Sequence, residues 1–248
     1  MDALLKRAPE TYGTFYEPFL GGAALFFALR PKKAVLGDTN ERLVRTYLGV
    51  QQKVEDVIAL LRTYKYERTF FEKTRARKID DATDAEVAAW FIYLNKCGFN
   101  GLYRVNSKNI FNVPFGRYTN PNICDEDTLR ACSKALKAAK IIVGDFQKVT
   151  SAAKANDFVY FDPPYIPLSA TSSFTSYTAG GFSHEDQERL RDHALGLKKK
   201  RVHVLLSNSS APAVRELYEG FTLEEVDARR SVNSRGASRG AIAELLMW

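Results

Sequence analysis

The sequence lacks the patterns that are typical of metal sites, disulfide frameworks and membrane-spanning segments. Its 248 residues include three cysteines and three histidines. No two cysteines have CxxC spacing, no histidine lies near them in the sequence and their number is odd, so neither a zinc site nor a disulfide framework is expected. No apolar run reaches the roughly 18 residues of a membrane helix, and the N-terminus has no apolar signal core. These absences predict a cytoplasmic protein with reduced thiols, no metal and no membrane segment.

The composition is that of an ordinary globular protein with an excess of positive charge. Hydrophobic residues make up 45% and charged residues 26% of the chain. The formal net charge of +7 suits a polyanionic partner such as nucleic acid. Charge alone does not identify that partner, because many basic proteins bind no nucleic acid.

Strand-like and helical patterns alternate along most of the chain. Such alternation predicts an α/β fold, a parallel sheet with helices on both faces. The block from residue 97 to 118 is rich in glycine, asparagine and aromatics and keeps no period, so we expect an insertion there. The expected strands are 14–20, 34–38, 140–145, 157–162, 202–208, 221–228 and 241–248. The expected helices are 23–30, 41–50, 54–64, 84–96, 127–139, 184–200 and 211–220.

A glycine turn follows the first expected strand. Gly21 and Gly22 stand at the carboxyl end of that strand, where α/β sheets bind ligands and glycines let the backbone approach them closely. Asp38 ends the second expected strand, where an acid can accept hydrogen bonds from ribose hydroxyls. The GxGxxG pattern of a dinucleotide site is missing, so a nucleoside cofactor fits better. The alternative is a tight turn beside a solvated acid.

The tetrapeptide Asp162-Pro163-Pro164-Tyr165 is the most informative motif. It follows an apolar strand, and its two prolines stiffen the turn and remove two backbone donors. The Asp162 carboxylate and the Pro163 carbonyl can accept hydrogen bonds from an exocyclic aromatic amine, which frees the lone pair to attack, while Tyr165 stacks on the base. With a methyl donor that is already activated, catalysis needs positioning and electrostatics rather than a metal. The alternative is a rigid proline turn after a buried strand.

With these motifs, the sequence resembles the Dam-type (D12 class) adenine-N6 DNA methyltransferases over nearly its whole length. The segments that carry the resemblance are Tyr16–Phe27, Gly37–Asn40, Leu94–Tyr118, Gly144–Phe146, Asp157–Tyr165 and Leu205–Ser209. The resemblance implies a Rossmann-like sheet that uses S-adenosylmethionine, releases S-adenosylhomocysteine and carries a mostly helical target-recognition insertion. It implies a catalytic domain over residues 1–50 and 119–248 and a target-recognition domain over residues 51–118.

The resemblance also assigns residues to parts of the cofactor. Asp38 would bind the ribose, and Asp162 would serve both the amino-acid end of the cofactor and the target amine. The residues at 145 and 146 would hold the cofactor's adenine. The full expected set is Phe19, Gly21, Asp38, Asp145, Phe146 and Asp162.

The irregular block has the chemistry of a DNA contact. Between residues 96 and 118 it carries lysines and arginines but no acid, interleaved with aromatics that can stack on bases or wedge between them. An adenine amine is unreachable inside duplex DNA, so the base must flip out, and Phe99 is the candidate wedge. The resemblance implies that Arg104 reads the edge of a guanine base, and it indicates GATC as the target. The expected contacts are Phe99, Asn100, Leu102, Arg104, Asn112, Pro114 and Arg117. The alternative is a surface hairpin with a solvated basic face.

Two C-terminal segments carry further predictions. The loop Ser169–Phe182 follows the catalytic turn and is expected to fold over the flipped base. No acid lies between residues 228 and 243, so the arginines there are expected to contact phosphates. These are Arg229, Arg230, Arg235 and Arg239.

One departure from the family concerns the N-terminus. Members usually carry a Trp-Ala-Gly-Gly-Lys segment just before the residues that match Leu4–Pro9, and this sequence starts at Met1 without it. We therefore expect a truncated or late-starting chain with reduced activity. Two alternatives stay open: a catalytically impaired DNA-binding protein of the same fold, and a methyltransferase that acts on RNA adenine. The resemblance implies a bacterial or phage protein that acts at the nucleoid without an obligate protein partner.

Overall fold

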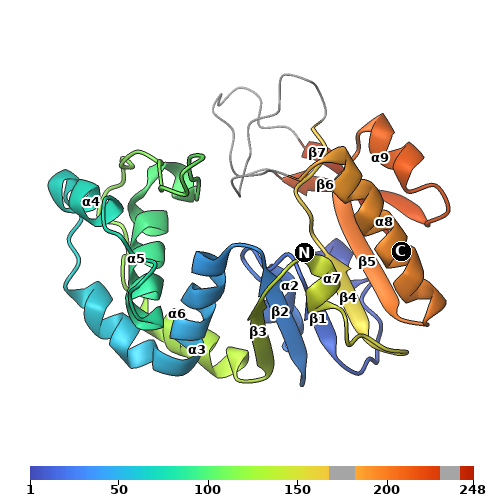
Figure 1. Ribbon diagram of the computed structural model, residues 1–248, viewed down its shortest axis with the longest axis horizontal. Coiled ribbons are helices and arrows are strands. Elements are labelled where there is room, and N and C mark those ends of the chain that lie inside the picture. Colours follow the sequence, from blue (N-terminus) through green and yellow to red (C-terminus); the bar gives the residue numbers. More distant parts are fainter. Residues whose placement is uncertain (168–181, 230–240) are drawn as a thin grey trace. The chain divides into compact units, whose positions relative to one another are not determined.

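The computed structural model describes residues 1–167, 182–229 and 241–248. Strands and helices follow one another in the order of an α/β protein (Figure 1). The described residues form two compact units. Unit 1 holds Met1–Gly37 and the described residues from Gly144 to Trp248, and unit 2 holds Asp38–Val143.

Seven strands of the described chain form one sheet, in the order β3-β2-β1-β4-β5-β7-β6. β1 pairs in parallel with β2 and β4, and β4 pairs in parallel with β5. β7 is antiparallel to both β5 and β6. The strands are β1 (Phe15–Glu17), β2 (Ala34–Asp38), β3 (Ala139–Val143), β4 (Phe158–Phe161), β5 (His203–Ser209), β6 (Leu223–Arg229) and β7 (Ala241–Met247).

The expected α/β fold is confirmed, with corrections at three strands. The expectation of a wholly parallel sheet is wrong for β7, because residues 230–240 are too few for the dozen or more of a parallel crossover from β6. β1 ends at Glu17 rather than at residue 20, since Pro18 has no N–H for the ladder. β3 ends at Val143, because Asp145 already caps the next helix by accepting the Lys148 N–H at 2.9 Å.

Helices were expected at most of the places where the described chain has them. Their bounds are α1 (Asp2–Leu5), α2 (Ala24–Leu29), α3 (Glu41–Arg62), α4 (Arg68–Arg75), α5 (Asp84–Cys97), α6 (Glu126–Leu136), α7 (Phe146–Val149), α8 (His184–Lys199) and α9 (Pro212–Leu217), with a 3-10 turn η1 at Phe99–Gly101. The sequence did not predict α7, which is too short to show a helical period. α3 spans both expected helices, and its non-helical residue Lys53 lies between them.

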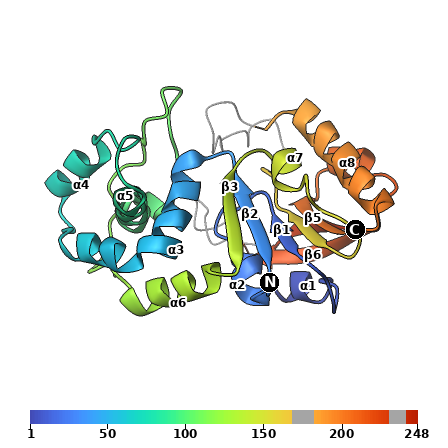
Figure 2. The ribbon, with the colours of Figure 1, turned by 60° about the horizontal axis from the view of Figure 1, so that its bottom comes forward.

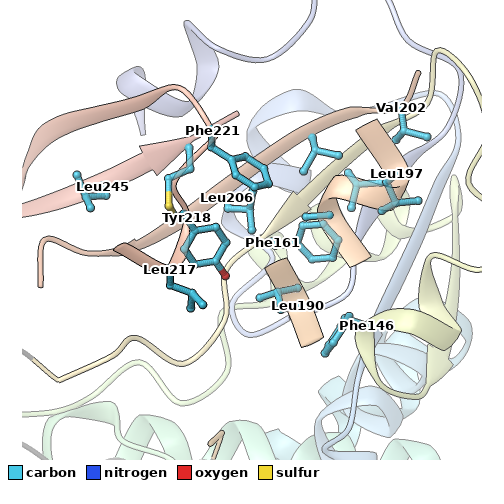
Figure 3. Close-up of a cluster of buried hydrophobic side chains, with 14 of the residues drawn as sticks. Phe146, Phe161, Leu190, Leu197, Val202, Leu206, Leu217, Tyr218, Phe221 and Leu245 are labelled. Atoms are coloured by element: carbon cyan, nitrogen blue, oxygen red, sulfur yellow. The ribbon is translucent and has the colours of Figure 1, made fainter. Parts of the chain in front are cut away.

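The core of unit 1 lies on both faces of its central strands. Every residue of β1 and β4 is buried, which is typical of strands that are covered on both sides. On one face, Leu190 and Leu197 of α8 and Leu217 of α9 pack in one cluster with Phe161 and Leu206 (Figure 3). This packing holds α8 and α9 against the sheet.

The helices of unit 2 pack around α5. α3 and α4 both contact α5, and α3 also contacts α6 (Figure 2). Side chains define where these helices begin: Asn40 accepts the Leu43 N–H at 3.2 Å, and Thr83 forms a capping box with Glu86. Unit 2 is thus a helical scaffold with its own buried core.

Gly49 marks a close approach of α3 to α5. A Cβ there would overlap the Asp84 carbonyl oxygen and lie 2.8 Å from the Ala88 Cβ. We expect Gly49→Ala to lower the free energy of unfolding by about 1–3 kcal/mol, although alanine is the better helix former. Gly196→Ala is the matched control, because its Cβ would meet nothing within 4 Å and should stabilise α8 by about 0.5–1 kcal/mol. Urea unfolding measures both variants, and equal effects would contradict this packing.

Candidate functional site

The turn Asp162–Tyr165 leaves the carboxyl end of β4, between β1 and β5. In the parallel register Phe161 lies opposite Leu206, so the next residues, Asp162 and Ser207, face one another. The Ser207 hydroxyl donates to Asp162 Oδ1 at 2.6 Å, and the Tyr160 hydroxyl lies 3.0 Å from Ser207 Oγ. Because serine has one proton to give, Tyr160 donates to Ser207, and the two hydroxyls form a chain that ends on the carboxylate.

Asp162 is a hydrogen-bond acceptor whose carboxyl group lies among other protein atoms, although the residue is exposed. Asp162 as a whole residue is exposed, whereas the strand residues before it are buried. Desolvation by the surrounding protein atoms disfavours the charged form and raises the pKa of Asp162. The hydrogen bonds from Ser207 and Tyr165 favour the charged form and partly offset that rise. Burial, and then the charge of Asp162, raise the pKa of Tyr165. A ligand with N–H donors can therefore reach a preorganised carboxylate next to an aromatic ring.

Glu17, the last residue of β1, is a second carboxyl group coupled to Asp162. It is 3% exposed, and its Oε2 accepts the Phe26 N–H at 3.2 Å. Ala23, the N-cap of α2, makes no side-chain cap, so Glu17 supplies it from β1. Burial, and to a lesser degree the charge of Asp162, raise the pKa of Glu17 to about 8. Glu17 was not among the predicted site residues, although a lone acid in an apolar strand is a usable signal.

Glu17→Gln is expected to change how stability depends on pH. Glutamine keeps the acceptor for the Phe26 N–H but cannot ionise. The folded protein holds the Glu17 proton up to a pH of about 8, whereas an unfolded chain releases it near 4.5. Between these values the free energy of unfolding of the wild type falls as pH rises, by up to about 1.4 kcal/mol per pH unit from this group.

The measurement is urea unfolding of both proteins at about pH 5 and about pH 8. The stabilising contribution of the buried, protonated Glu17 is complete below pH 4.5 and lost by about pH 8. Glu17→Gln should therefore gain on the wild type as pH rises. A difference between the two proteins that is the same at both pH values would contradict the raised pKa.

Aromatic rings gather beside the glycine turn. The rings of Phe19 and Phe146 stack with centroids 5.8 Å apart, and the Phe182 ring meets Phe19 edge-on at 5.6 Å. The Arg189 guanidinium lies over the Phe146 ring and 3.4 Å from Asp145 Oδ2. Phe146 is 2% exposed, so it supports the half-buried Phe19 rather than offering an open face. Phe182 was missed because no sequence pattern links it to this cluster.

The glycine turn itself leaves room for a ligand. Gly21 has a φ of +42°, which favours glycine, and a Cβ added at Gly22 would meet nothing within 4 Å. Within unit 1 the structure thus brings together Phe19, Asp145 and Phe146. In unit 2, Asp38 ends β2, and its Oδ1 accepts the Asn40 N–H at 2.9 Å.

The block from Gly98 to Phe115 is a hairpin that rests on α5. Bridges join Gly98 to Phe115 and Val105 to Phe111. The inward rings pack on the helix, with Tyr103 stacked on Phe91 at 4.4 Å and Phe111 6.1 Å from Trp90. Alternate residues along each strand must then face outward. Buried and more exposed residues therefore alternate along this block, a two-residue period that was not predicted from the sequence.

The outward side carries most of the expected DNA contacts. Arg104 is exposed, and its Nε donates to Asn112 Oδ1 at 2.8 Å across the hairpin. Phe99 is 44% exposed, and its N–H donates to the carbonyl of the exposed Pro114 at 2.9 Å. Asn100 has a φ of +53° in the turn η1. Of the others, Arg117 is exposed and Leu102 is partly buried.

Comparison with known proteins gives one consistent family. A family model for D12 class N6 adenine-specific DNA methyltransferases matches residues 1–232. A Type II methyltransferase of Lactococcus lactis subsp. cremoris, M1.LlaDCHI, is 47% identical over 247 residues, covering 96% of this chain and 87% of its own. The DNA adenine methylase of Escherichia coli (strain K12) is 34% identical over 248 residues, covering 98% and 88%.

The chain belongs to the D12 class N6 adenine-specific DNA methyltransferases. The resemblance drawn from the sequence motifs is thereby confirmed, as is the mixed α/β sheet expected of this class. A Type II methyltransferase of Methanocaldococcus jannaschii, M.MjaIII, is 42% identical over 251 residues, covering 94% of this chain and 87% of its own. The similarity to named methyltransferases therefore extends over nearly the whole chain.

Some expectations for this D12 methyltransferase fall outside the described residues. They are the closing loop up to residue 181, Arg230, Arg235, Arg239 and the side chain of Arg229. Within the described ranges, no helix is long and apolar enough to cross a membrane. The same ranges contain no cluster of three or more histidine, cysteine or acidic residues that could hold a metal ion.

Proposed function

We propose that this D12 methyltransferase transfers the methyl group of S-adenosylmethionine to N6 of an adenine that is flipped out of duplex DNA, within the sequence GATC. The observation that carries the proposal is the exposed residue Asp162 at the carboxyl end of β4, whose carboxylate accepts the Ser207 hydroxyl and which is followed by Pro163 and Tyr165. Membership of the family supplies the adenine and the DNA.

The chemistry asked of the turn is activation of a weak nucleophile. The adenine amine is conjugated with its ring, so its lone pair attacks poorly. The Asp162 carboxylate and the Pro163 carbonyl would accept its two N–H groups and favour a pyramidal nitrogen. Tyr165 would hold the base by stacking. These groups are fixed before the base arrives, so little reorganisation remains for the reaction itself.

The cofactor would lie along the glycine turn and the aromatic cluster. When bound, it supplies a methyl group activated on a sulfonium. Phe19, Gly21 and Asp145 would hold its nucleoside, with Phe146 supporting the Phe19 ring from behind, and Asp38 would bind its ribose. The carboxyls of Asp162 and Glu17 would offset its positive charge, and that charge would in turn favour their ionised forms.

DNA recognition is assigned to the hairpin of unit 2. Arg104 would read a guanine edge with its guanidinium fork, and Phe99 would fill the space left by the flipped adenine. Leu102 and Pro114 would touch neighbouring bases. The remaining contacts would come from Asn100, Asn112 and Arg117. On this proposal residues 51–118 recognise the target, and residues 1–50 and 119–248 bind the cofactor and catalyse.

Transfer of labelled methyl groups tests the proposal. The substrates are a duplex with GATC, the same duplex with that site scrambled, and a matched single-stranded RNA. Label on the GATC duplex alone is the expected result. Label on both duplexes would keep the chemistry and reject the sequence. Label on the RNA alone would favour an RNA methyltransferase, and no label with intact DNA binding would favour an impaired binding protein.

A further inference from the structure

The backbone on both sides of Tyr165 is tied to buried side chains from other elements. Gln187 of α8 donates from Nε2 to the Pro164 carbonyl at 2.9 Å. On the other side, the Ile166 N–H donates to Asn208 Oδ1 at 3.0 Å. Tyr165 is therefore held between two anchored peptide groups.

The anchors form one connected network. Asn208 donates from Nδ2 to Gln187 Oε1 at 3.2 Å, and Ser209 donates from Oγ to the Ile166 carbonyl at 2.6 Å. Gln187 is 2% exposed, Asn208 0% and Ser209 1%. Buried polar groups are costly unless bonded, so a network this complete has one low-energy arrangement.

Gln187 connects the anchors on the two sides of Tyr165, because both its amide oxygen and its amide nitrogen form hydrogen bonds. Its Oε1 accepts from Asn208 and lies 3.4 Å from the Tyr218 hydroxyl, which leaves Nε2 to face Pro164. The residue is fixed by α8, whose Leu190 packs in the core beneath. The orientation of the amide therefore follows from three neighbours and not from one contact.

The turn needs such outside support because of its prolines. Pro163 and Pro164 have no N–H, so neither can donate a hydrogen bond that would tie the turn to the sheet. The network instead anchors the turn through the Pro164 carbonyl and through the N–H and carbonyl of Ile166.

We propose that Gln187 is a positioning residue for methyl transfer: it holds the Pro164 carbonyl, so that Asp162 and the Pro163 carbonyl meet the target amine. The inference rests on the proposed catalytic role of Asp162–Tyr165. The two carbonyls of the turn then have different roles. The Pro164 carbonyl, which is bonded to Gln187, anchors the turn, and the Pro163 carbonyl binds the substrate.

The test is Gln187→Met in the full chain, a change that keeps the length of the side chain but removes its donor. We expect kcat to fall roughly tenfold to hundredfold, because small misplacements of reacting groups have effects of this size. KM for the duplex and the dissociation constant for S-adenosylmethionine should stay within about twofold, since Gln187 would touch neither.

Leu197→Ala is the matched control, because it loosens the core packing of the same helix nearly three turns beyond Gln187. We expect it to lower the urea midpoint at least as much as Gln187→Met while kcat stays within about twofold of the wild type. A kcat for Gln187→Met within twofold of the wild type would overturn the inference. So would equal losses of kcat in both variants, since these would mean general loosening of α8.

Failure of the proposed function would look different. The wild type would then transfer no methyl group, or Asp162→Ala would keep full activity, and the inference would fall with it. With an active wild type and an inactive Asp162→Ala, the comparison of Gln187→Met with Leu197→Ala tests the inference alone.

Discussion

Asp162→Ala is expected to lower kcat for methyl transfer by roughly 100- to 1000-fold, which is the cost of removing one preorganised polar group from a transition state. Asp162 is an exposed residue that follows β4 directly, and its carboxylate accepts the Ser207 hydroxyl at 2.6 Å. Its loss removes an acceptor for the target amine. Steady-state kinetics with a labelled methyl donor measure the effect.

Asp162→Asn is the matched control for shape. Asparagine keeps an oxygen acceptor but has no charge, so it should lie between the wild type and Asp162→Ala. Because the pKa of Asp162 is raised, the activity of the wild type should also fall on acidification as the carboxylate takes up a proton. A kcat for Asp162→Ala within about tenfold of the wild type would remove Asp162 from the reaction.

Arg104→Ala should have the largest effect on target choice. A bidentate contact with a guanine edge discriminates by about 1–3 kcal/mol, so kcat/KM on GATC should fall roughly tenfold to hundredfold. On duplexes in which another base replaces that guanine, kcat/KM should barely change. The Asn112 side chain orients Arg104 at 2.8 Å, so the guanidinium is prepared for one direction of approach. Competition assays between the duplexes report the ratio.

Lys108→Ala is the control for general electrostatics. Lys108 is exposed near the tip of the same hairpin, and we expect a lysine there to contact phosphate rather than a base edge. It should weaken all duplexes alike and make binding less dependent on salt. Equal losses on all duplexes for Arg104→Ala would show that Arg104 contacts backbone phosphate and does not read a base.

The sequence predicted the elements whose signals are local. The order of strands and helices, the start of α5 and the turn after β4 all rest on neighbouring residues, and the structure has them where expected. The position of β7 between β5 and β6 was not predictable in this way. Strand order depends on which apolar faces meet, and a period in the sequence does not contain that information.

The site shows the same division. The motif Asp162–Tyr165 is contiguous and could be read directly. Glu17 acts through a hydrogen bond to α2 and through its closeness to Asp162, and Gln187 acts through a turn that lies 23 positions before it in the chain. Nothing in the sequence around Gln187 distinguishes it from a solvated helix residue, so its contact with Pro164 had to come from the tertiary structure.

The most direct test of the account is to identify the methylated nucleoside. A GATC duplex treated with the protein and S-adenosylmethionine is digested to nucleosides, which are then separated by chromatography and identified by mass spectrometry. The account predicts N6-methyldeoxyadenosine from the GATC duplex, none from the scrambled duplex, and none with Asp162→Ala. A methyl group on the cytosine of GATC, or an equal yield of methylated adenine from both duplexes, would contradict it.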